Sequence, residues 1–332
     1  MKLLTNEKID IKKWHDGIKQ SGFSSPFQTP EFYNFFNSID GLSADVFAVE
    51  ENNTYSALVV VTVQKEKGPQ GFFSRRGIIY GGPLVKQNQS FALTNLLREI
   101  STYYRNKLIY LEIRNYFDFS AYKDIFENNN FKYNRHLNVQ LSIGNRSVKD
   151  ILTKMKYNRR REINISYKEG TSVKSASTIE EVNQLYKILE SLYRARVKLP
   201  LPDFSYFENL YKSEIGKVFI VKHEEKIIGG AFCLYYEDLS IYTLYYAGIR
   251  DYHKKIFPTH LAIMGVIEFA VNKNLKYIDF MGAGKPDEDY GVRDFKLQFG
   301  GDLVEHGRYI LILNPALYKI GVLGLKMLAK IQ

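Results

Sequence analysis

The sequence has one cysteine among its 332 residues and no run of 18 or more apolar residues. A single thiol cannot form an internal disulfide, and the apolar segment Ala231–Tyr236 around Cys233 predicts a buried core position. Without a long apolar run, no membrane-spanning helix is predicted. The opening residues, MKLLTNEKIDIKKWHDG, also lack the apolar stretch of a secretory signal, so we expect a cytoplasmic protein.

Familiar catalytic and metal-binding motifs are absent as well. The six histidines are scattered, with no H-E-x-x-H pattern and no cysteine partners, so neither a metal site nor a cofactor is predicted. No serine lies in a G-x-S-x-G motif, and no G-x-x-x-x-G-K-[ST] motif occurs. These absences argue against a serine hydrolase and against a P-loop nucleotide-binding protein.

The length and the charge narrow the possibilities. A chain of 332 residues is long for one domain and suits two, and its 45% hydrophobic and 25% charged residues are ordinary for a globular protein. The formal net charge of +10 favours anionic partners, namely nucleic acid, phosphorylated metabolites or an anionic membrane surface. Charge alone does not choose among these partners.

An internal repeat relates the two halves of the chain. Val46–Glu50 (VFAVE) resembles Val218–Lys222 (VFIVK), 172 residues later. Leu108–Glu112 (LIYLE) resembles Leu275–Asp279 (LKYID) at an offset of 167 residues. Because the two offsets nearly agree, we interpret the halves as a diverged duplication.

Each half has the same predicted order: a helix, two or three β-rich runs, an amphipathic helix, a strand, a helix and a last strand. In the second half these elements are Ile179–Arg194, Lys217–Val221, Ile227–Tyr236, Ser240–Gly248, Thr259–Asn272, Lys276–Met281, Gly291–Phe299 and Val304–Leu313. This order resembles the GNAT acyltransferase fold. We therefore predict an α/β (α+β) protein of two tandem GNAT-like domains, each a mixed, mainly antiparallel sheet flanked by helices.

The domain boundary is predicted near residue 145. Residues 1–145 form the N-terminal domain, and residues 146–332 form the C-terminal domain together with a basic linking helix, Lys149–Glu169, and a terminal helix, Pro315–Ile331. The terminal segment Ala316–Lys330 combines apolar residues with three lysines. This composition suits either packing on the first domain or peripheral contact with a membrane surface.

The loop Arg250–Thr259 is the candidate site for the phosphates of a donor. GNAT enzymes that use acetyl-CoA bind its pyrophosphate at a Gly-rich turn before a helix, but this segment contains no glycine. It supplies charge and a helix start instead, which suits a larger phosphate-bearing donor or an ordinary solvated loop. The donor-binding candidates are Arg250, Lys254, Lys255 and Thr259.

Landmarks along nearly the whole chain resemble the FemABX-like proteins and their acyltransferase relatives. They are Phe27–Phe32 (FQTPEF), Gly81–Pro83 (GGP), Asn158–Ile163 (NRRREI), Lys168–Gly170, Tyr193–Arg196 (YRAR), Pro200, Pro202, Phe257–Thr259 (FPT), Asp279–Gly282 (DFMG) and Val292–Gly301 (VRDFKLQFGG). The resemblance implies two GNAT-like domains and transfer of an acyl or aminoacyl group. Some members use aminoacyl-tRNA to extend peptidoglycan stem peptides, and some of these carry a long coiled-coil insertion that this sequence lacks.

The resemblance places Lys296, the lysine of the FK…FGG motif, at the reaction centre. An ammonium there would stabilise a developing oxyanion or hold a substrate phosphate, and the flanking Phe295 predicts a partly enclosed setting. Asp279 ends a strand just before Gly282–Gly284. Its carboxylate would act as a base or orienting group for the incoming amine, or would accept hydrogen bonds from N–H groups of the loop.

Phe295 and four further residues are candidates for substrate binding. The resemblance implies that Arg196, with Arg194 as its competitor, binds an acceptor phosphate, although an ordinary charge at a helix end is an equal alternative. Arg159 belongs to a run of three arginines that either forms a solvated basic face or contacts the donor, RNA included. Tyr246 lies on the strand beside the gap by which GNAT-like sheets admit the donor.

The leading functional hypothesis is a transferase that forms an amide. Its donor would be acyl-CoA, acyl carrier protein or aminoacyl-tRNA, and its acceptor an amine on a cell-wall or surface-polymer precursor. The alternatives are a catalytically silent tandem-GNAT binding protein and a sequence-independent nucleic-acid binder. The last alternative lacks any nucleic-acid-reading motif, so DNA is not an expected partner.

Overall fold

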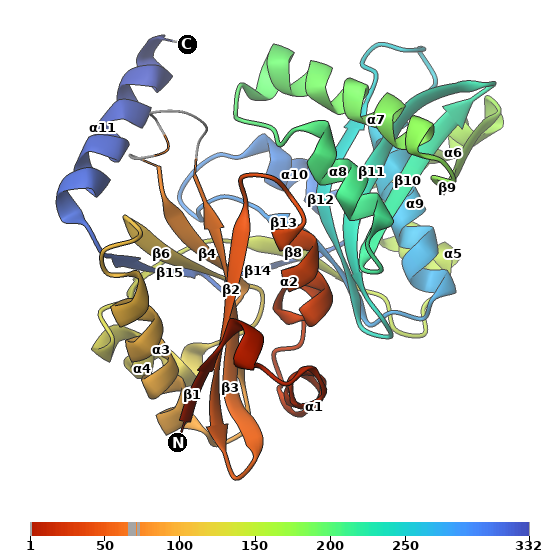
Figure 1. Ribbon diagram of the computed structural model, residues 1–332. Coiled ribbons are helices and arrows are strands. Elements are labelled where there is room, and N and C mark those ends of the chain that lie inside the picture. Colours follow the sequence, from red (N-terminus) through yellow and green to blue (C-terminus); the bar gives the residue numbers. More distant parts are fainter. Residues whose placement is uncertain (1, 66–70, 72–73, 332) are drawn as a thin grey trace. The chain divides into compact units, whose positions relative to one another are not determined.

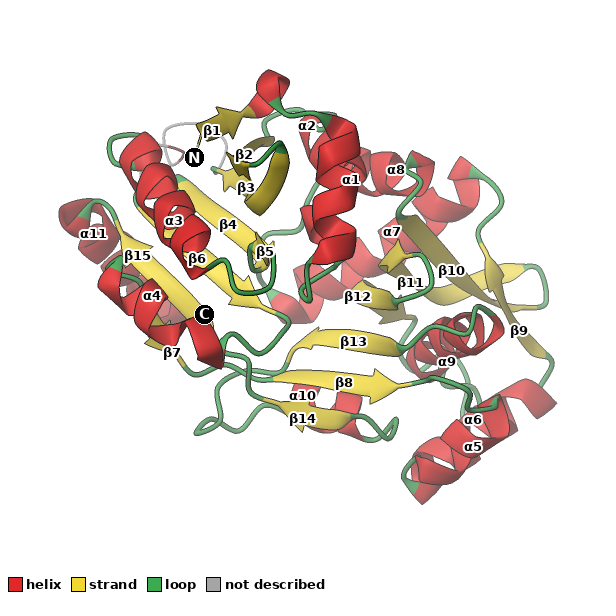
Figure 2. Ribbon diagram, turned by 90° about the horizontal axis from the view of Figure 1, so that it is seen from below, coloured by secondary structure: helices red, strands yellow, loops and turns green. Residues whose placement is uncertain are grey.

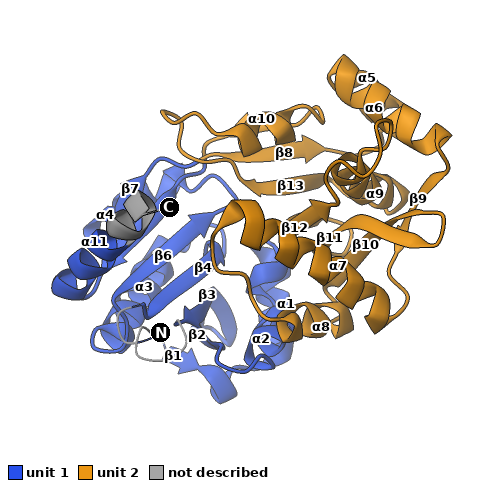
Figure 3. Ribbon diagram, turned by 90° about the horizontal axis from the view of Figure 1, so that it is seen from above, with its two compact units in different colours: residues 1–136, 306–332 blue, residues 137–305 orange. Residues whose placement is uncertain are grey.

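The chain forms two compact units, which Figure 3 colours separately. The computed structural model describes residues 2–65, 71 and 74–331, and in the last helix it describes side chains up to Gly324. Unit 1 contains the chain up to residue 136 together with the residues from 306 onward, and unit 2 contains residues 137–305. Each unit has one mixed sheet and its own helices.

Unit 1 is built on an eight-stranded sheet (Figures 1 and 2). Its strand order is β1 (Lys2–Thr5), β2 (Ser43–Glu51), β3 (Thr54–Gln64), β4 (Arg76–Gly81), β6 (Tyr110–Asn115), β15 (Arg308–Ile312) and β7 (Lys132–Asn134), with β5 (Leu84–Val85) paired to β3. Among the described strands of this sheet, β4 and β6 are the one parallel pair. The helices are α1 (Ile11–Gln20), α2 (Pro30–Asn37), α3 (Ser90–Tyr104), α4 (Lys123–Asn128) and α11 (Pro315–Ile331).

Unit 2 is built on a seven-stranded sheet. Its strand order is β9 (Thr171–Ser175), β10 (Gly216–His223), β11 (Lys226–Tyr236), β12 (Ser240–Gly248), β13 (Tyr277–Gly282), β8 (Asn138–Ser142) and β14 (Asp302–Val304). Here β12 and β13 are the parallel pair. The helices are α5 (Val148–Lys154), α6 (Tyr157–Lys168), α7 (Ile179–Leu192), α8 (Phe204–Lys212), α9 (Pro258–Asn272) and α10 (Gly291–Leu297).

The two sheets correspond strand for strand, and the predicted repeat explains why. The run β2-β3-β4-β6 matches β10-β11-β12-β13 in order and direction. Next to this run, each sheet receives a strand from the other half of the sequence. β15, near the C-terminus, lies between β6 and β7, whereas β8, from the first half, lies between β13 and β14.

This exchange changes two boundaries expected from the sequence. The compact units do not divide at residue 145, because β8 belongs to unit 2 and the residues from 306 onward belong to unit 1. The single last strand predicted for Val304–Leu313 is also wrong. It is two strands in different sheets, β14 and β15, separated by residues 305–307, where Gly307 has a φ of +68° that glycine adopts easily.

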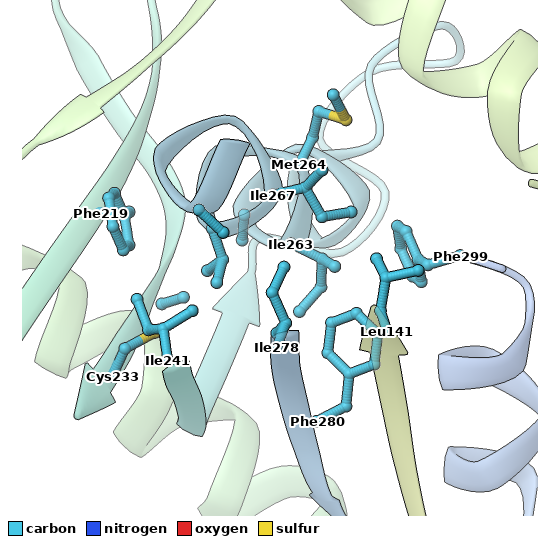
Figure 4. Close-up of a cluster of buried hydrophobic side chains, with 14 of the residues drawn as sticks. Leu141, Phe219, Cys233, Ile241, Ile263, Met264, Ile267, Ile278, Phe280 and Phe299 are labelled. Carbon is cyan, nitrogen blue, oxygen red and sulfur yellow. The ribbon is translucent and has the colours of Figure 1, made fainter. Parts of the chain in front are cut away.

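The core of unit 2 surrounds α9, as the close-up in Figure 4 shows. The helix begins at Pro258, which suits a first helical position, and nine of its fifteen residues are buried. Ile263, Met264 and Ile267 belong to the same buried cluster as Cys233 of β11 and Leu141 of the exchanged strand β8. The exchanged strand is therefore an integral part of this core.

The predicted linking helix Lys149–Glu169 is interrupted. It consists of α5 and α6, with extended backbone at Met155, and the Lys156 N–H donates to the Gln298 carbonyl instead of continuing the helix. No proline or glycine marks this break in the sequence. The tertiary hydrogen bond to the α10 region therefore sets the boundary.

The predicted terminal helix Pro315–Ile331 is confirmed as α11. Lys319 lies within the described side chains, whereas Lys326 and Lys330 lie outside them. Among the helices described between residues 2 and 331, none has the length and apolar character that a bilayer span requires.

Candidate functional site

The strand ladder of unit 2 opens at its parallel pair. β12 and β13 are paired at only three positions, the last being Tyr242 with Asp279, although β12 continues to Gly248 and β13 to Gly282. Beyond this point β12 also contains one extra residue, Leu244, opposite the step from Phe232 to Cys233 of β11. The backbone of β12 therefore has no β13 partner along its second half in the described ladder.

Lys296 lies beside the end of this open pair. It belongs to α10 and is only 6% exposed, and its Nζ donates to the Gly282 carbonyl at 2.7 Å and to the Met281 carbonyl at 3.4 Å. Burial lowers the pKa of Lys296 to about 8, and the carboxylate of Asp279 opposes this shift. The ammonium is thus poised to change its charge near neutral pH.

Asp279 is fully buried on β13 and faces three donors. Its carboxylate accepts from Gln140 Nε2 at 3.0 Å, from Asn138 Nδ2 at 3.3 Å and from the Met281 N–H at 2.6 Å. Burial raises the pKa of Asp279, and these hydrogen bonds act in the opposite direction. Asp279 does accept an N–H, as one of the two roles left open by the sequence required, but the donor is Met281 at the end of β13 and not a residue of the loop that follows.

The hydrogen bond from Met281 holds an uncommon backbone conformation. Met281 has a φ of +64°, a region that few residues other than glycine adopt. Because the carbonyls of Met281 and Gly282 accept from Lys296, Asp279 fixes the end of β13 that orients the ammonium. Asp279 and Lys296 therefore belong to one polar group.

Asn138 and Gln140 were missed by the sequence analysis because β8 was assigned to the first domain. A local signal did exist. The strand reads NVQLS, so Asn138 and Gln140 lie on one face while Val139 and Leu141 lie on the other, in the core. Only the pairing of β8 with β13 brings this polar face to Asp279.

Tyr246 and Phe295 form an aromatic wall in the same region. Their rings stack with centroids 5.7 Å apart and an interplanar angle of 15°, which joins the open half of β12 to α10. Burial raises the pKa of Tyr246, with smaller contributions from Tyr290 and Tyr193 nearby. The structure therefore brings together two residues that the sequence analysis had named. One of them, Phe295, directly precedes Lys296 in the chain.

Arg159 is buried, which corrects the expectation of a solvated basic face. Its guanidinium lies 4.8 Å from the ring centre of Phe295 and 4.9 Å from that of Phe299, and its Nη2 donates to Gln298 Oε1 at 2.8 Å. The sequence had left a solvated basic face and donor contact as the two alternatives for this run of arginines. Here the rings around α10 enclose the first of the three.

His260 extends this cluster to the start of α9. Its ring stacks on Phe257 with centroids 5.2 Å apart, and its Nδ1 lies 3.3 Å from a carboxylate oxygen of Glu162. Burial, and then the positive charge of Arg159, lower the pKa of His260 to about 3. The imidazole is consequently neutral at physiological pH, and no sequence motif had singled it out.

The donor-loop candidates lie between β12 and α9. Arg250 and Lys254 are exposed, whereas Lys255 pairs with Glu169 at 3.2 Å. Thr259 lies in the first turn of α9 against Gly248, where an added Cβ would come within 2.7 Å of the threonine hydroxyl. The close approach of the helix start to the end of β12 therefore depends on glycine at position 248.

Arg194 and Arg196 lie on an exposed π-helical turn, Tyr193–Val197, which ends at Lys198 in the left-handed conformation. Arg194 pairs with Glu190 at 3.7 Å. Within the described residues, no contact joins either arginine to Lys296 or Asp279. The turn nevertheless begins at Tyr193, whose ring centre lies 6.1 Å from that of Tyr245 on β12.

The residues of this candidate site all belong to unit 2. The site combines an open strand pair, a buried ammonium and a neutral histidine next to a basic loop. Across the described ranges, no cluster of three or more His, Cys, Asp or Glu side chains could hold a metal ion.

Comparison with known proteins supports an acyltransferase. Residues 153–296 match the family model described as the acetyltransferase (GNAT) domain, which includes Lys296 and most of the site. No curated protein matches the chain by sequence with significance. The matched segment covers the open strand pair, the donor loop and α10 as far as Lys296.

Solved structures share the fold of the whole chain. FemX has a TM-score of 0.74 at 16% identity, covering 96% of this chain and 99% of its own. L-PGS from Bacillus licheniformis has a TM-score of 0.58 at 12% identity, covering 95% and 96%. A tandem GNAT protein from the clavulanic acid biosynthesis pathway has a TM-score of 0.56 at 9% identity, covering 95% and 99%. The predicted fold of two tandem GNAT-like domains is therefore confirmed.

Proposed function

We propose that this protein, an acyltransferase with a FemABX-like tandem GNAT fold, forms an amide by transferring an acyl or aminoacyl group from a phosphate-bearing donor to an amine. The observation that carries this proposal is the opening of β12 from β13 beside the buried Lys296. Unpaired backbone N–H groups and a fixed ammonium are the groups that stabilise negative charge on an acyl oxygen. The acceptor is an amine on a cell-wall or surface-polymer precursor.

The reaction needs no covalent enzyme intermediate. The neutral acceptor amine attacks the acyl carbonyl carbon, the new C–N bond forms, and the carbonyl oxygen becomes an oxyanion. Collapse of this intermediate breaks the bond to the donor, whose leaving group takes a proton as the amine loses one. Lys296 stabilises the oxyanion, and Asp279 acts as the orienting group that holds the Met281–Gly282 carbonyls and thereby the ammonium.

The donor's phosphates are held by Arg250, Lys254, Lys255 and Thr259 at the start of α9. The helix N-terminus adds a favourable dipole, and Pro258 leaves the first turn well formed. Tyr246 and Phe295 flank the acyl group. Arg159 contacts the ring of Phe295 and holds it in position. Arg196 or Arg194 binds a phosphate on the acceptor.

A thermal-shift measurement with separate donors tests this assignment. Acyl-CoAs, acylated carrier protein, and charged and uncharged tRNA are each added to the protein, because a bound donor raises the melting temperature by mass action. The double variant Lys254→Glu/Lys255→Glu should lose the shift. The matched control is Lys273→Glu/Lys276→Glu, two exposed lysines elsewhere in unit 2, which should keep it.

The identity of the productive donor decides the reaction. A shift specific to charged tRNA identifies aminoacyl transfer, and a shift with acyl-CoA or acyl carrier protein identifies N-acyl transfer. If no donor shifts the melting temperature and no amide product forms with an amine acceptor, the protein is a catalytically silent tandem-GNAT binding protein. Equal shifts with unrelated DNA and RNA would instead point to non-specific nucleic-acid binding.

A further inference from the structure

The terminal helix α11 presents an apolar outer side. Ile320 is 52% exposed and Leu323 is 54% exposed, and together with Ala316 they recur at the spacing of one helix face. The opposite side is attached to the sheet of unit 1, where the ring of Tyr318 meets that of Tyr110 with centroids 5.6 Å apart. Packing on the sheet therefore leaves Ile320 and Leu323 uncovered within unit 1.

A basic pocket lies at the start of the same helix. It has a volume of about 190 Å³ and is lined by Arg75, Arg105, Asn106, Lys107, Leu108, Ile109, Leu313, Asn314 and Leu317. None of these residues is acidic, and Arg105 and Lys107 are exposed at its edge. The pocket and the first turn of α11 share Asn314 and Leu317, so the cationic and apolar features adjoin.

The charged side chains at this end of the sequence all have the same sign. From residue 306 to residue 332 there is no Asp or Glu, while Arg308, Lys319, Lys326 and Lys330 are cationic. The segment that carries this exposed apolar side has no acidic side chain of its own, which does not suit a generally soluble surface. It suits a partner that is apolar inside and anionic at its surface.

We propose that α11 and the adjoining basic pocket, together the α11 surface, dock on an anionic lipid bilayer. Ile320 and Leu323 enter the boundary between headgroups and acyl chains, while Arg105, Lys107 and Lys319 contact lipid phosphates. The α11 surface belongs to unit 1, and none of its residues belongs to the proposed transfer site in unit 2. The inference therefore stands independently of the proposed reaction.

Vesicle co-sedimentation of the full chain tests the proposal. Vesicles of phosphatidylcholine alone are compared with vesicles that also contain phosphatidylglycerol. Binding should require the anionic lipid and should weaken as salt is raised, because screening removes the headgroup attraction. The variants Ile320→Ser/Leu323→Ser and Arg105→Glu/Lys107→Glu should each bind about tenfold more weakly.

Matched controls separate docking from general changes in surface character. Phe91→Ser removes an apolar side chain that is 65% exposed on α3, and Lys12→Glu/Lys19→Glu reverses two exposed charges on α1. Both controls should bind vesicles as the unchanged protein does. Circular dichroism and thermal melting verify that every variant is folded, and transfer activity on soluble substrates should be unchanged in the α11-surface variants.

Three results would overturn the proposal. The first is equal or absent binding to both kinds of vesicle. The second is a dimer in light scattering that Ile320→Ser/Leu323→Ser abolishes without any vesicle binding, which would make a second copy the occupant. The third is binding that inorganic phosphate fully displaces and that Ile320→Ser/Leu323→Ser leaves intact, which would identify a phosphate pocket without docking.

Discussion

The two units have the same strand order, but only unit 2 opens its parallel pair. In unit 1, β4 and β6 are paired at six consecutive positions, from Arg76 with Tyr110 to Gly81 with Asn115. In unit 2, β12 and β13 separate after three. The closed pair keeps its backbone groups in the ladder, whereas the open pair leaves them available to a ligand. Under the proposed function, unit 2 carries the transfer site and unit 1 does not.

The acidic residue on the central strand of each unit shows the same divergence. By the repeat, Glu112 of β6 corresponds to Asp279 of β13, and each meets side chains of the exchanged strand. Arg308 of β15 and Arg114 bind Glu112, both at 2.9 Å. Burial acts to raise the pKa of Glu112, but the two guanidinium groups outweigh it and lower the pKa.

In unit 2 the partners of the acidic residue are neutral amides and one N–H, and the pKa of Asp279 is raised. The carboxylate of unit 1 is thus neutralised by fixed charges. That of unit 2 lies in the field of Lys296, a cation that titrates. At equivalent positions, unit 1 therefore has a buried carboxylate paired with two arginines, whereas unit 2 has a buried carboxylate near a lysine whose pKa is about 8.

The largest expected effect comes from removing the ammonium of unit 2. Lys296→Met should lower kcat by about 10²–10³-fold, because oxyanion stabilisation acts only in the transition state. Donor affinity should change little. Lys273→Met, an exposed lysine of the same unit, is the control for turnover and for thermal melting. Unchanged turnover in Lys296→Met would remove the residue from the reaction.

The pH profile should follow the titration of Lys296. Because the protonated form is the active one and its pKa is about 8, activity should fall as pH rises above that value, by up to about tenfold per pH unit. Lys296→Arg stays charged and should lack this fall. The ratio of the two activities at each pH cancels the titration of the acceptor amine. A ratio independent of pH would contradict a cationic role.

The free energy of unfolding should depend on Glu112 of unit 1. Glu112→Gln leaves two arginines without their carboxylate and should lower the free energy of unfolding by about 1–3 kcal/mol at pH 7. The folded pKa of Glu112 is below its usual 4.5, so its stabilisation is present at neutral pH and is lost as pH falls through the folded value. The deficit of Glu112→Gln should therefore shrink in acid, as urea unfolding at several pH values would show.

Asp279→Asn is the matching change in unit 2. The folded pKa of Asp279 is raised above 3.8, so its ionised form costs stability at neutral pH, and its removal should destabilise less than Glu112→Gln. Turnover should fall, because Met281 and Gly282 at the end of β13, which orient Lys296, lose the carboxylate that holds them. Equal destabilisation by the two changes would erase the contrast between the units.

The smallest expected effect concerns Arg159, whose guanidinium lies over the rings of Phe295 and Phe299. Arg159→Met keeps much of the volume between the two rings but loses the charge and the bond to Gln298, so kcat should fall several-fold with KM for the donor nearly constant. The pKa of His260 should rise, because the positive charge of Arg159 helps to lower it. NMR titration of His260 measures this shift, while kcat and KM measure the effect on the reaction. Arg161→Met, at an exposed position, is the control.

The local pattern of the sequence determined most elements of the second half. β12 matches its predicted bounds, and β10, β11, α9 and β13 match to within a few residues. Hydrophobic periodicity is set by each element's own burial, so it can be read without the partner. Tyr246 and Phe295 were each named from the sequence, but the stacking of their rings was not predicted.

Only the tertiary structure decided which strands were exchanged, and with them the partners of Asp279. β8 and β15 are short, and nothing in their own residues specifies which sheet they join, since strand pairing is a contact between distant parts of the chain. The burial of Arg159 has the same origin. Its neighbours in sequence are polar, and its rings come from α10 and the residues just after it, more than a hundred residues away. The sequence determined the elements, and packing between distant elements determined the site.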